Sequence, residues 1–532
     1  MTSWIVVLSG PIRSGKTTLA TRLSDKFGMT LIKTHDLIQN AYKNRSVKGR
    51  IELQAYGERL DRETKGQWVS NELAKVVVSK GNNAALVVDS ARIPEQVTAI
   101  RRAFPRVTHI HLTAGDEILR KRYDKRAAVD HDPVKYAEAK KNATERGVER
   151  LADIADIVID TELCTEDDVF VRATSRMSLY KNNSGLVDVL IGGQFGSEGK
   201  GQIVNYLARE YDYIVRVGGP NAGHTVMEAE GTPYIYHQVP SGARTSGAHN
   251  VLGPGMVVNV TKLLKEISEC ELGIEQLSID PRVMTISQAD IDSEEGIFQR
   301  IGSTKQGVGA ATARRITDRG LDTVVMAEKV PELAPFIKPT YEVLFDALSK
   351  NKRVLVEGTQ GTGLSLYHGD YPFVTSRETT VSGCLSEVGI APRRVRRVIM
   401  VCRTYPIRVE SPPGGTSGPL KDISWKVVSR RSGIPAKELE ALEHTSTTNR
   451  KRRVGEFDWS LLRKAAFLNG PTDVALTFAD YLAKENADAI RFEQLNDKTI
   501  EFIEEVERVS GAPVSLITTG RGDRHVIDRR SW

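Results

Sequence analysis

The chain has 532 residues, more than a single hydrophobic core usually serves, so two or three domains are expected. Charged residues make up 27% and hydrophobic residues 40% of the sequence, a balance that excludes a wholly disordered chain. The net charge of +6 is small for this length, and the basic clusters at residues 393–397 and 450–453 lack the zinc spacing and interleaved aromatic residues of nucleic-acid-binding domains, so no nucleic-acid partner is expected.

The sequence carries no sign of disulfides, a zinc site or a membrane segment. Its four cysteines lie far apart without a Cys-x-x-Cys spacing, at Cys164, Cys270, Cys384 and Cys402. No apolar stretch approaches the roughly 20 residues that a spanning helix needs, and the first residues show neither a basic start nor a cleavage signature. We therefore expect a cytoplasmic protein without a membrane partner.

Two glycine-rich turns organise the chain, and each follows a short apolar run that is typical of a buried parallel strand. Residues 5–8 precede a turn at residues 9–17, and residues 187–191 precede a turn at residues 192–200. Because a buried strand followed by such a turn commonly begins an α/β unit, each turn is expected to open a domain.

The predicted fold class is α/β, with two P-loop-type domains that are each a mostly parallel sheet flanked by helices. Apolar runs at residues 85–88 and 107–112 alternate with helix-like segments, as βαβ units require. We place the two domains at residues 1–180 and 186–532, with the polar stretch 181–185 as the linker.

The first turn reads Gly10-Pro11-Ile12-Arg13-Ser14-Gly15-Lys16-Thr17 and fits the pattern G-x-x-x-x-G-K-[ST] after a strand. In that context backbone N–H groups and a helix N-terminus bind phosphates. Lys16 is expected to reach the β- and γ-phosphates and Thr17 to bind Mg²⁺, while Asp89 holds the ion through water. The nucleotide-binding residues predicted for this domain are Gly10, Gly15, Lys16, Thr17, Thr18 and Asp89.

Over about 160 residues, the N-terminal domain resembles nucleoside monophosphate kinases and dephospho-CoA kinases. Residues 34–36 stand where monophosphate kinases start their acceptor helix, and Arg122 and Arg126 share one helical face. The two arginines either clamp the transferring phosphate or form a solvated helix face. The resemblance implies a phosphotransferase whose acceptor cannot be read from the sequence; the alternative is a domain that only senses nucleotide and regulates its neighbour.

The second turn, Gly193-Gln194-Phe195-Gly196-Ser197-Glu198-Gly199-Lys200-Gly201, has one added residue and a glycine where a metal-binding Ser or Thr stands in the first pattern. It resembles the opening motif of the adenylosuccinate synthetase family, and seven further segments agree with that family in order and spacing. These segments are residues 218–225, 237–242, 301–304, 357–362, 371–376, 447–453 and 519–524. The resemblance covers essentially residues 186–532.

This resemblance implies a ligase that joins L-aspartate to C6 of a purine nucleoside monophosphate. A purine 6-oxygen is a poor leaving group, so a nucleoside triphosphate first phosphorylates O6 and the aspartate amine then displaces phosphate. By resemblance, His224 supports O6 as its charge changes, Lys200 neutralises the γ-phosphate and Gln360 holds the 6-phosphoryl intermediate. The implied cofactor is Mg²⁺, bound by phosphate oxygens and the backbone carbonyl of Gly223.

Further residues match the family's substrate-binding positions. Asn221, Thr304, Thr375 and Arg450 are among them, and the last three match positions that hold the monophosphate. Arg319 matches an arginine that the family delivers from a second subunit, which implies a homodimer.

Two other groups of positions carry over from the family. The loop that closes over aspartate matches Thr447, Thr448, Arg450 and Arg452, where a bidentate guanidinium suits a carboxylate; a basic surface loop is the alternative. The triphosphate is expected at Gly196, Gly199, Asp480 and Gly520.

Ser197 stands where typical members of the family have the aspartate that removes the purine N1 proton. A serine needs an activating partner to act as a base at neutral pH, so its presence indicates a different substrate. A second branch of the family, found in phages that replace adenine with 2-aminoadenine, also has serine here and accepts deoxyguanylate (dGMP). The sequence resembles this branch more closely, which implies that aspartate is joined to dGMP to give N6-succinyl-2-amino-dAMP.

Two more departures bear on substrate choice. Typical members read guanine with a Thr-Lys-Leu-Asp element, whereas this chain has Phe478 in place of the lysine, so ATP or dATP is expected in preference to GTP. Residues 410–415 replace the family's usual segment without indicating a role. The alternative is a conventional adenylosuccinate synthetase that uses inosinate (IMP), aspartate and GTP.

Overall fold

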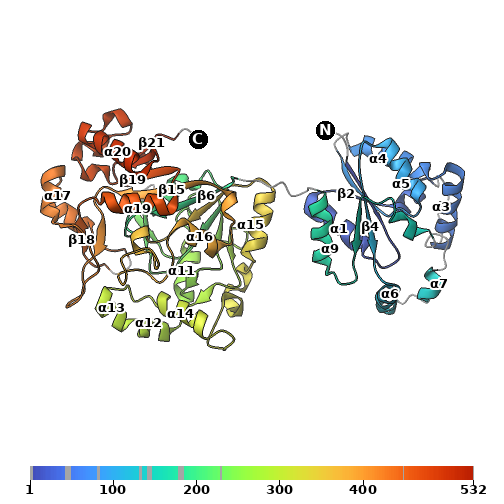
Figure 1. Ribbon diagram of the computed structural model, residues 1–532, viewed down its shortest axis with the longest axis horizontal. Helices are drawn as coiled ribbons and strands as arrows, with labels where there is room; N and C mark the ends of the chain where they lie inside the picture. The colour runs from blue at the N-terminus through green and yellow to red at the C-terminus, as the bar shows by residue number, and fades with distance from the viewer. Residues whose placement is uncertain are drawn as a thin grey trace. The chain divides into compact units, whose positions relative to one another are not determined.

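The computed structural model describes residues 4–41, 50–80, 84–130, 135–140, 147–177, 185–227, 231–446 and 449–530. The chain forms two compact units, Met1–Lys181 and Asn182–Trp532, which run from blue to green and from green to red in Figure 1. Residues 181–184 of the expected linker lie outside the described residues.

Unit 1, Met1–Lys181, contains a five-stranded parallel sheet in the order β2-β3-β1-β4-β5. Its strands are β1 (Trp4–Ser9), β2 (Thr30–Lys33), β3 (Ala85–Asp89), β4 (Arg106–Thr113) and β5 (Ile157–Asp160). Its helices are α1 (Lys16–Phe27), α2 (Thr34–Ala41), α3 (Arg50–Thr64), α4 (Gln67–Lys80), α5 (Pro94–Ala103), α6 (Asp116–Asp130), α7 (Tyr136–Lys140) and α9 (Glu166–Arg176).

Helices cover both faces of this sheet because alternate residues of the central strand point to opposite sides. Ile5 and Val7 pack with α4 and α5, whereas Val6 and Leu8 pack with α1 and α9. The strand is therefore a continuous apolar run rather than an alternating one, as a parallel strand buried on both faces requires.

Unit 2, Asn182–Trp532, is built on a nine-stranded sheet in the order β12-β10-β7-β14-β6-β15-β19-β20-β21, in which only the edge strand β21 is antiparallel to its neighbour. The strands in this order are Leu277–Ile279, His249–Leu252, Tyr213–Arg216, Val354–Glu357, Val187–Gly192, Val395–Arg403, Asp473–Thr477, Val514–Thr518 and Val526–Asp528. Short ladders join β8 (His224–Met227) to β9 (Pro233–Tyr236), β11 (Val257–Val258) to β13 (Met284–Thr285), and β18 (Arg452–Gly455) to β16 (Ile407–Val409) and β17 (Asp422–Ile423).

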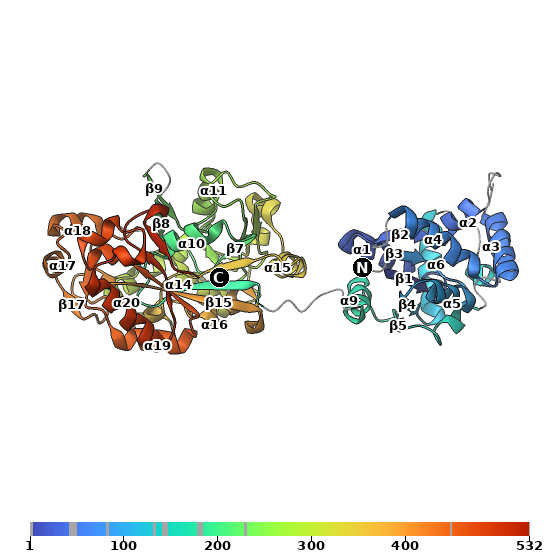
Figure 2. The same ribbon diagram turned by 90° about the horizontal axis from the view of Figure 1, so that it is seen from above.

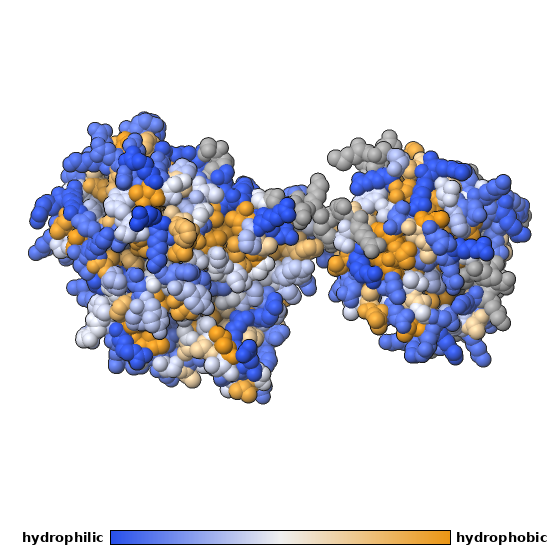
Figure 3. Space-filling model, viewed as in Figure 1, coloured by the Kyte–Doolittle hydropathy of each residue, from blue (hydrophilic) through white to orange (hydrophobic). Residues whose placement is uncertain are grey.

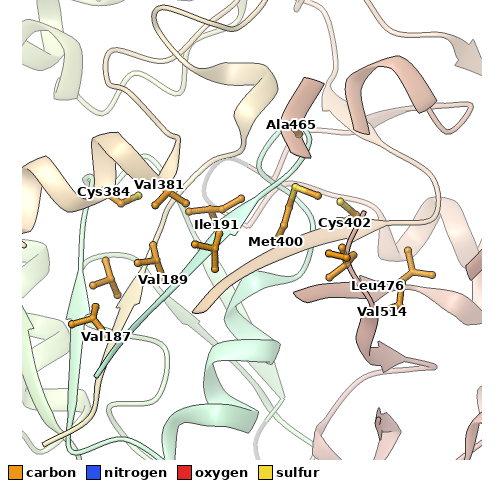
Figure 4. Packing of buried hydrophobic residues seen from close by; sticks show 14 of the residues in the cluster. Val187, Val189, Ile191, Val381, Cys384, Met400, Cys402, Ala465, Leu476 and Val514 are labelled. Atoms are coloured by element: carbon orange, nitrogen blue, oxygen red, sulfur yellow. The ribbon is translucent and has the colours of Figure 1, made fainter. Parts of the chain in front are cut away.

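The helices of unit 2 also cover both faces of its large sheet. They are α10 (Lys200–Ala208), α11 (Val260–Glu269), α12 (Gln288–Ser293), α13 (Glu295–Ile301), α14 (Val308–Thr317), α15 (Thr340–Ser349), α16 (Val381–Val388), α17 (Trp425–Ser432), α18 (Ala436–Leu442), α19 (Trp459–Asn469) and α20 (Asp497–Ser510). Val189 and Ile191 pack against α16 and α19 (Figure 4), while Leu190 packs against α10. Figure 2 shows α10 on one side of the large sheet and α16 and α19 on the other. The predicted α/β class with two mostly parallel sheets is confirmed.

Hydrophilic residues predominate on the face of each unit that Figure 3 shows, with hydrophobic residues scattered between them. Among the described residues, no helix combines the length and the apolar character needed to cross a membrane.

Candidate functional site

The phosphate loop of unit 1 joins β1 to α1, and its glycines are required by close approach and backbone conformation. A Cβ at Gly10 would lie 2.1 Å from the carbonyl oxygen of Leu112. Gly15 caps α1 with a φ of +98°, a left-handed conformation that glycine adopts readily. Lys16 is 8% exposed, and its Nζ donates to the carbonyl oxygens of Gly10 and Pro11 at 2.8 and 2.7 Å.

A cleft of about 1560 Å³ opens beside this loop. Gly15, Lys16, Thr17, Thr18 and Asp89 all line it, and the Thr17 hydroxyl donates to the Asp89 carboxylate at 2.7 Å. Gly10 does not line the cleft, but its carbonyl oxygen accepts from Lys16 Nζ.

The same cleft takes in residues 34–35 and both arginines that the sequence pairs on one helical face. Arg122 donates to the Thr161 hydroxyl at 2.9 Å and to the Thr161 carbonyl at 2.7 Å, whereas the Arg126 side chain is exposed. The cleft therefore combines a phosphate loop, a hydroxyl–carboxylate pair and the two arginines of α6.

Two buried histidines under the phosphate loop were not expected from the sequence. The Ser9 hydroxyl lies 2.7 Å from His109 Nε2 and 2.9 Å from His111 Nδ1. Burial, with the charges of Arg101 and Lys16 as further causes, lowers the pKa of His109 and of His111 to about 4. Both rings are therefore neutral at physiological pH, and alternation along a buried strand was the only sequence signal for them.

The phosphate loop of unit 2 joins β6 to α10 and is shaped by a carboxylate that sequence reasoning missed. Glu198 is 1% exposed; its Oε1 accepts the backbone N–H groups of Gln194 and Gly196 at 3.0 and 2.8 Å. Its Oε2 accepts from Lys200 Nζ at 2.6 Å. Gly199 caps α10 with a φ of +83°. Lys200 is thus an ion-paired residue inside the loop.

His224, at the start of β8, is held by a buried network. Its Nδ1 lies 2.6 Å from Glu357 Oε1, which also accepts from Arg216 Nη1 at 2.7 Å and from the Ser241 hydroxyl. Since a carboxylate only accepts, the proton of the neutral ring belongs on Nδ1. The Nε2 atom is buried and has no hydrogen-bond partner among the described residues.

His224 and Glu357 in this network differ in their protonation. Burial lowers the pKa of His224 to about 3, and the nearby Arg216 charge contributes. Burial alone raises the pKa of Glu357, but the Arg216 charge and the hydrogen bonds from His224 and Ser241 outweigh that effect and hold it at about 2. The histidine is therefore neutral and the glutamate ionised.

Gln360 is fixed next to the same loop with a positive φ of 57°. Its amide donates to Asn221 Oδ1 at 3.1 Å and its Oε1 accepts from the Thr359 hydroxyl at 2.9 Å. Arg377 reaches the Thr359 hydroxyl at 3.0 Å and ion-pairs with Glu387 at 2.6 Å. Arg377 is thus a second-layer contact to Gln360 that no sequence pattern indicated.

A pocket of about 380 Å³ brings most of the expected site residues of unit 2 together. The predicted residues that line it are Gly196, Ser197, Asn221, Gly223, His224, Thr304, Gln360, Thr375 and Arg452. The carbonyl of Gly223 accepts from the Ser446 hydroxyl at 2.9 Å.

The other expected residues lie outside this pocket. Arg450 is at its margin, where it donates to the carbonyls of Gly302, at 3.2 Å, and Glu410. Arg319 is exposed after α14 and does not line the pocket. Thr447 and Thr448 lie outside the described residues.

The expected triphosphate residues Gly199, Asp480 and Gly520 follow β6, β19 and β20, three parallel strands of the same sheet. A Cβ at Gly199 would contact the Phe478 ring at 3.5 Å, and the Phe478 N–H donates to the Thr518 hydroxyl at 3.1 Å, two residues before Gly520. Burial raises the pKa of Asp480 to about 7, and its Oδ1 has no hydrogen-bond partner among the described residues. Asp480 Oδ1 is therefore a buried hydrogen-bond acceptor just after the carboxyl end of β19.

Two phosphate loops at the carboxyl edges of parallel sheets define a nucleotide-binding α/β protein. The family model described as adenylosuccinate synthetase matches residues 189–330 and 325–490, and one described as AAA domain matches residues 6–143. The chain belongs to the adenylosuccinate synthetase family, and it is a carbon–nitrogen ligase of that type.

Similar proteins agree with this assignment. The adenylosuccinate synthetases of Pyrococcus horikoshii and Methanocaldococcus jannaschii are each 38% identical to the chain, over 64% of its length and 98% and 96% of theirs. Two solved structures share the fold: a fully ligated adenylosuccinate synthetase from Plasmodium falciparum (TM-score 0.58, 22% identity, 65% of this chain and 100% of that one) and a cyanophage S-2L succinoaminodeoxyadenylate synthetase bound to dGMP and dATP (TM-score 0.56, 25% identity, 65% and 96%).

Proposed function

We propose that unit 2 joins L-aspartate to dGMP with ATP as the phosphate donor and belongs to the branch of the family that serves 2-aminoadenine. The observation that carries this proposal is Ser197, which lines one pocket with His224 and Gln360. By resemblance, typical members have an aspartate at this position. The smaller, uncharged hydroxymethyl group leaves room for the 2-amino group of guanine. The cyanophage structure, which is described as bound to dGMP with dATP as an energy donor, supports dGMP as the acceptor and an adenine nucleotide as the donor.

The reaction follows from the residues in the pocket. The base loses its N1 proton to water as O6 bonds to the γ-phosphate, whose bond to the β-phosphate oxygen breaks. The aspartate nitrogen then bonds to C6 and gives up a proton to the departing phosphate as the C6–O6 bond breaks. His224, neutral and with Nε2 unpartnered among the described residues, can accept and return a proton at O6. The Gln360 amide orients the 6-phosphoryl group, and Lys200 shares its charge between Glu198 and the γ-phosphate.

The choice of ATP rests on the segment that follows β19. Phe478 stands where typical members have a lysine that packs against guanine, and the guanidinium of Arg403 lies 4.0 Å from the centre of its ring. Phe478 carries no charge, so it cannot supply the cationic contact to guanine that the lysine provides. The preference for GTP is therefore weakened.

The oxygen atoms in both units suit Mg²⁺. In unit 1 the paired hydroxyl and carboxylate of Thr17 and Asp89 are hard ligands, and in unit 2 Gly223, whose carbonyl accepts from the Ser446 hydroxyl, lines the pocket. The described residues contain no group of three His, Cys, Asp or Glu side chains able to hold a metal, so the ion would depend on phosphate oxygens for most of its shell. When bound, it neutralises phosphate charge.

Unit 1 is proposed to act as a separate domain and as a (deoxy)nucleoside monophosphate kinase. Its cleft of about 1560 Å³ is lined by Lys16 together with Arg122 and Arg126, three cations suited to a transferring phosphate. Transfer of labelled phosphate from ATP to a monophosphate, lost in Lys16→Ala, tests this role; nucleotide binding without transfer would favour the sensing alternative.

A homodimer is proposed from Arg319. This exposed side chain does not line the pocket of its own chain, so the role implied by the family requires delivery to a second copy. Mixing Arg319→Ala with an inactive His224→Ala chain should restore one intact site per dimer, whereas a monomeric enzyme would show no recovery.

The substrate assignment is tested by one assay panel. The full chain is incubated with aspartate, Mg²⁺, ATP or GTP, and one of dGMP, GMP, dAMP or IMP, and N6-succinyl product is measured by chromatography. The highest kcat/KM is expected with dGMP and ATP. A preference for IMP with GTP would replace this proposal with the conventional synthetase.

A further inference from the structure

A buried carboxylate, Glu443, lies where three separate segments of unit 2 meet. It directly follows α18 and is 2% exposed. Its Oε1 accepts from Arg403 Nη2 and from the Tyr481 hydroxyl, and its Oε2 accepts from Arg452 Nη1, each at 2.9 Å. One side chain thus joins the end of β15, the segment after β19 and the start of β18.

The three donors belong to different parts of the site. Arg403 also donates from Nη1 to the carbonyl of Ser197 in the phosphate loop, at 3.2 Å. Tyr481 shares a single 3-10 turn with Asp480, the residue expected to contact the donor base. Arg452 lines the substrate pocket and belongs to the segment expected to bind aspartate.

Arg452 is prepared to bind a carboxylate. Its Nη1 is held by Glu443, while its Nε is buried and has no hydrogen-bond partner among the described residues. Burial favours the neutral form of Glu443, but the charges of Arg403 and Arg452 hold its pKa at about 2, so the group is ionised. Two cations around one carboxylate leave one positive charge in excess, and an incoming carboxylate would balance it.

We propose that Glu443 is a positioning residue that couples binding of the phosphate donor to binding of aspartate. The donor base fixes the turn that carries Tyr481, the Tyr481 hydroxyl fixes Glu443, and Glu443 orients the guanidinium of Arg452 toward the aspartate carboxylate. This inference rests on the proposed roles of Asp480 and Arg452. Because coupling is reciprocal, aspartate must strengthen donor binding by the same factor.

The chain offers a matched control at the opposite edge of the same sheet, where its parallel strands begin. The Tyr211 hydroxyl donates to Asp188 at 2.5 Å, and Arg396 Nε donates to the same carboxylate at 3.0 Å. Asp188 is fully buried near the start of β6, whereas the phosphate loop follows the end of that strand. Tyr211→Phe therefore removes the same type of hydrogen bond as Tyr481→Phe without touching the site.

The test measures the KM for aspartate in the full chain at low and at saturating donor concentration. In the wild type this KM should fall as donor concentration rises, by a factor in the typical range of about 5- to 150-fold. Tyr481→Phe should keep the KM for aspartate high at every donor concentration, with kcat changed much less than KM. Tyr211→Phe should retain the wild-type dependence. If Tyr481→Phe keeps it as well, the coupling proposal is overturned.

Two more variants separate failure of the coupling from failure of the site assignment. If Arg452→Lys leaves the KM for aspartate unchanged, Arg452 does not bind aspartate and the assignment itself is wrong. If Arg452→Lys raises this KM but neither Tyr481→Phe nor Glu443→Gln changes its donor dependence, only the coupling is wrong. The measurement uses whichever monophosphate and donor the assay panel selects, so it does not depend on the choice of dGMP.

Discussion

The two phosphate loops of this chain hold their lysines in different ways. In unit 1, Lys16 donates to the neutral carbonyls of Gly10 and Pro11. In unit 2, Lys200 donates to the carbonyl of Gly196 at 3.2 Å and to the carboxylate of Glu198 at 2.6 Å, and both Lys200 and Glu198 are 1% exposed. A similar strand–loop–helix arrangement thus gives the lysine carbonyl acceptors in both loops, and in unit 2 it adds a buried carboxylate from the loop itself.

The difference shows that a carboxylate of the loop itself, as well as a bound phosphate, can fix the conformation of a phosphate loop. Glu198 accepts two backbone N–H groups of its own loop, so it occupies donors that a simple P-loop offers to phosphate. We therefore expect unit 2 to bind phosphate more through side chains, and unit 1 more through backbone N–H groups.

The largest expected effects separate the chemistry of unit 2 from that of unit 1. His224→Ala or Gln360→Ala should reduce succinyl transfer by about 10²- to 10⁴-fold, because a proton-transfer or orienting group is lost. The fold should survive in His224→Ala, since Glu357 remains paired with Arg216 at 2.7 Å. Ligase turnover and the melting temperature are the measurements. Phosphotransfer by unit 1 should stay unchanged, and normal ligase turnover in either variant would contradict the assignment.

A pair of loop variants tests the comparison directly. Glu198→Gln leaves Lys200 buried without its counter-charge, so unit 2 should lose about 3–5 kcal/mol of unfolding free energy together with ligase activity. Lys16→Ala should abolish nucleotide phosphotransfer by unit 1, because its ammonium group is the one expected to reach the β- and γ-phosphates.

These two variants are compared by denaturant unfolding and by both activity assays. Ligase turnover at saturating substrates should be unaffected in Lys16→Ala. If it falls in parallel with phosphotransfer, the units do not act independently, and if Glu198→Gln unfolds like the wild type, the buried pair does not shape the loop.

A smaller effect is expected from Ser197→Asp in the loop of unit 2. The carboxylate is larger and charged, so it should crowd the 2-amino group of guanine while supplying a proton acceptor for a purine without that group. Selectivity should shift toward IMP by about 10- to 200-fold, or 1–3 kcal/mol. The ratio of kcat/KM for dGMP and IMP measures this, with ATP and GTP each used as donor. Unchanged dGMP turnover would show that Ser197 does not select the base.

A final prediction concerns the dependence of stability on pH. The pKa of His109 and of His111 is lowered to about 4, so below pH 6.5 the unfolded chain binds protons that the folded unit does not. The stability of unit 1 should therefore fall as pH decreases from about 6.5 to 4. Unit 2 should lose stability over a similar window through His224, and further below pH 4.5 through Glu357.

Urea unfolding at pH 7 and pH 5, with His109→Gln as the variant that cannot titrate, checks this dependence. The variant should show a shallower loss on acidification than the wild type. Equal slopes would show that the buried imidazole is not the group responsible.

Local features of the sequence were enough to predict the fold class. Residues 5–8 and 187–191 became the central strands β1 and β6, because continuous apolar runs are stable only when both faces are covered. The glycines at positions 10, 15, 196 and 199 indicated phosphate loops because the backbone conformations there are local properties. The agreement of spaced motifs indicated the family, which the family model confirms.

Only the tertiary structure decided which carboxylates matter. Glu198, Glu357 and Glu443 are ordinary acidic residues in the sequence, and the motifs did not assign a role to any of them. Glu357 pairs with an arginine 141 positions away and Glu443 with one 40 positions away. The role of a buried charge depends on the partners that surround it and on the water that is removed, and both are set by segments that folding brings together.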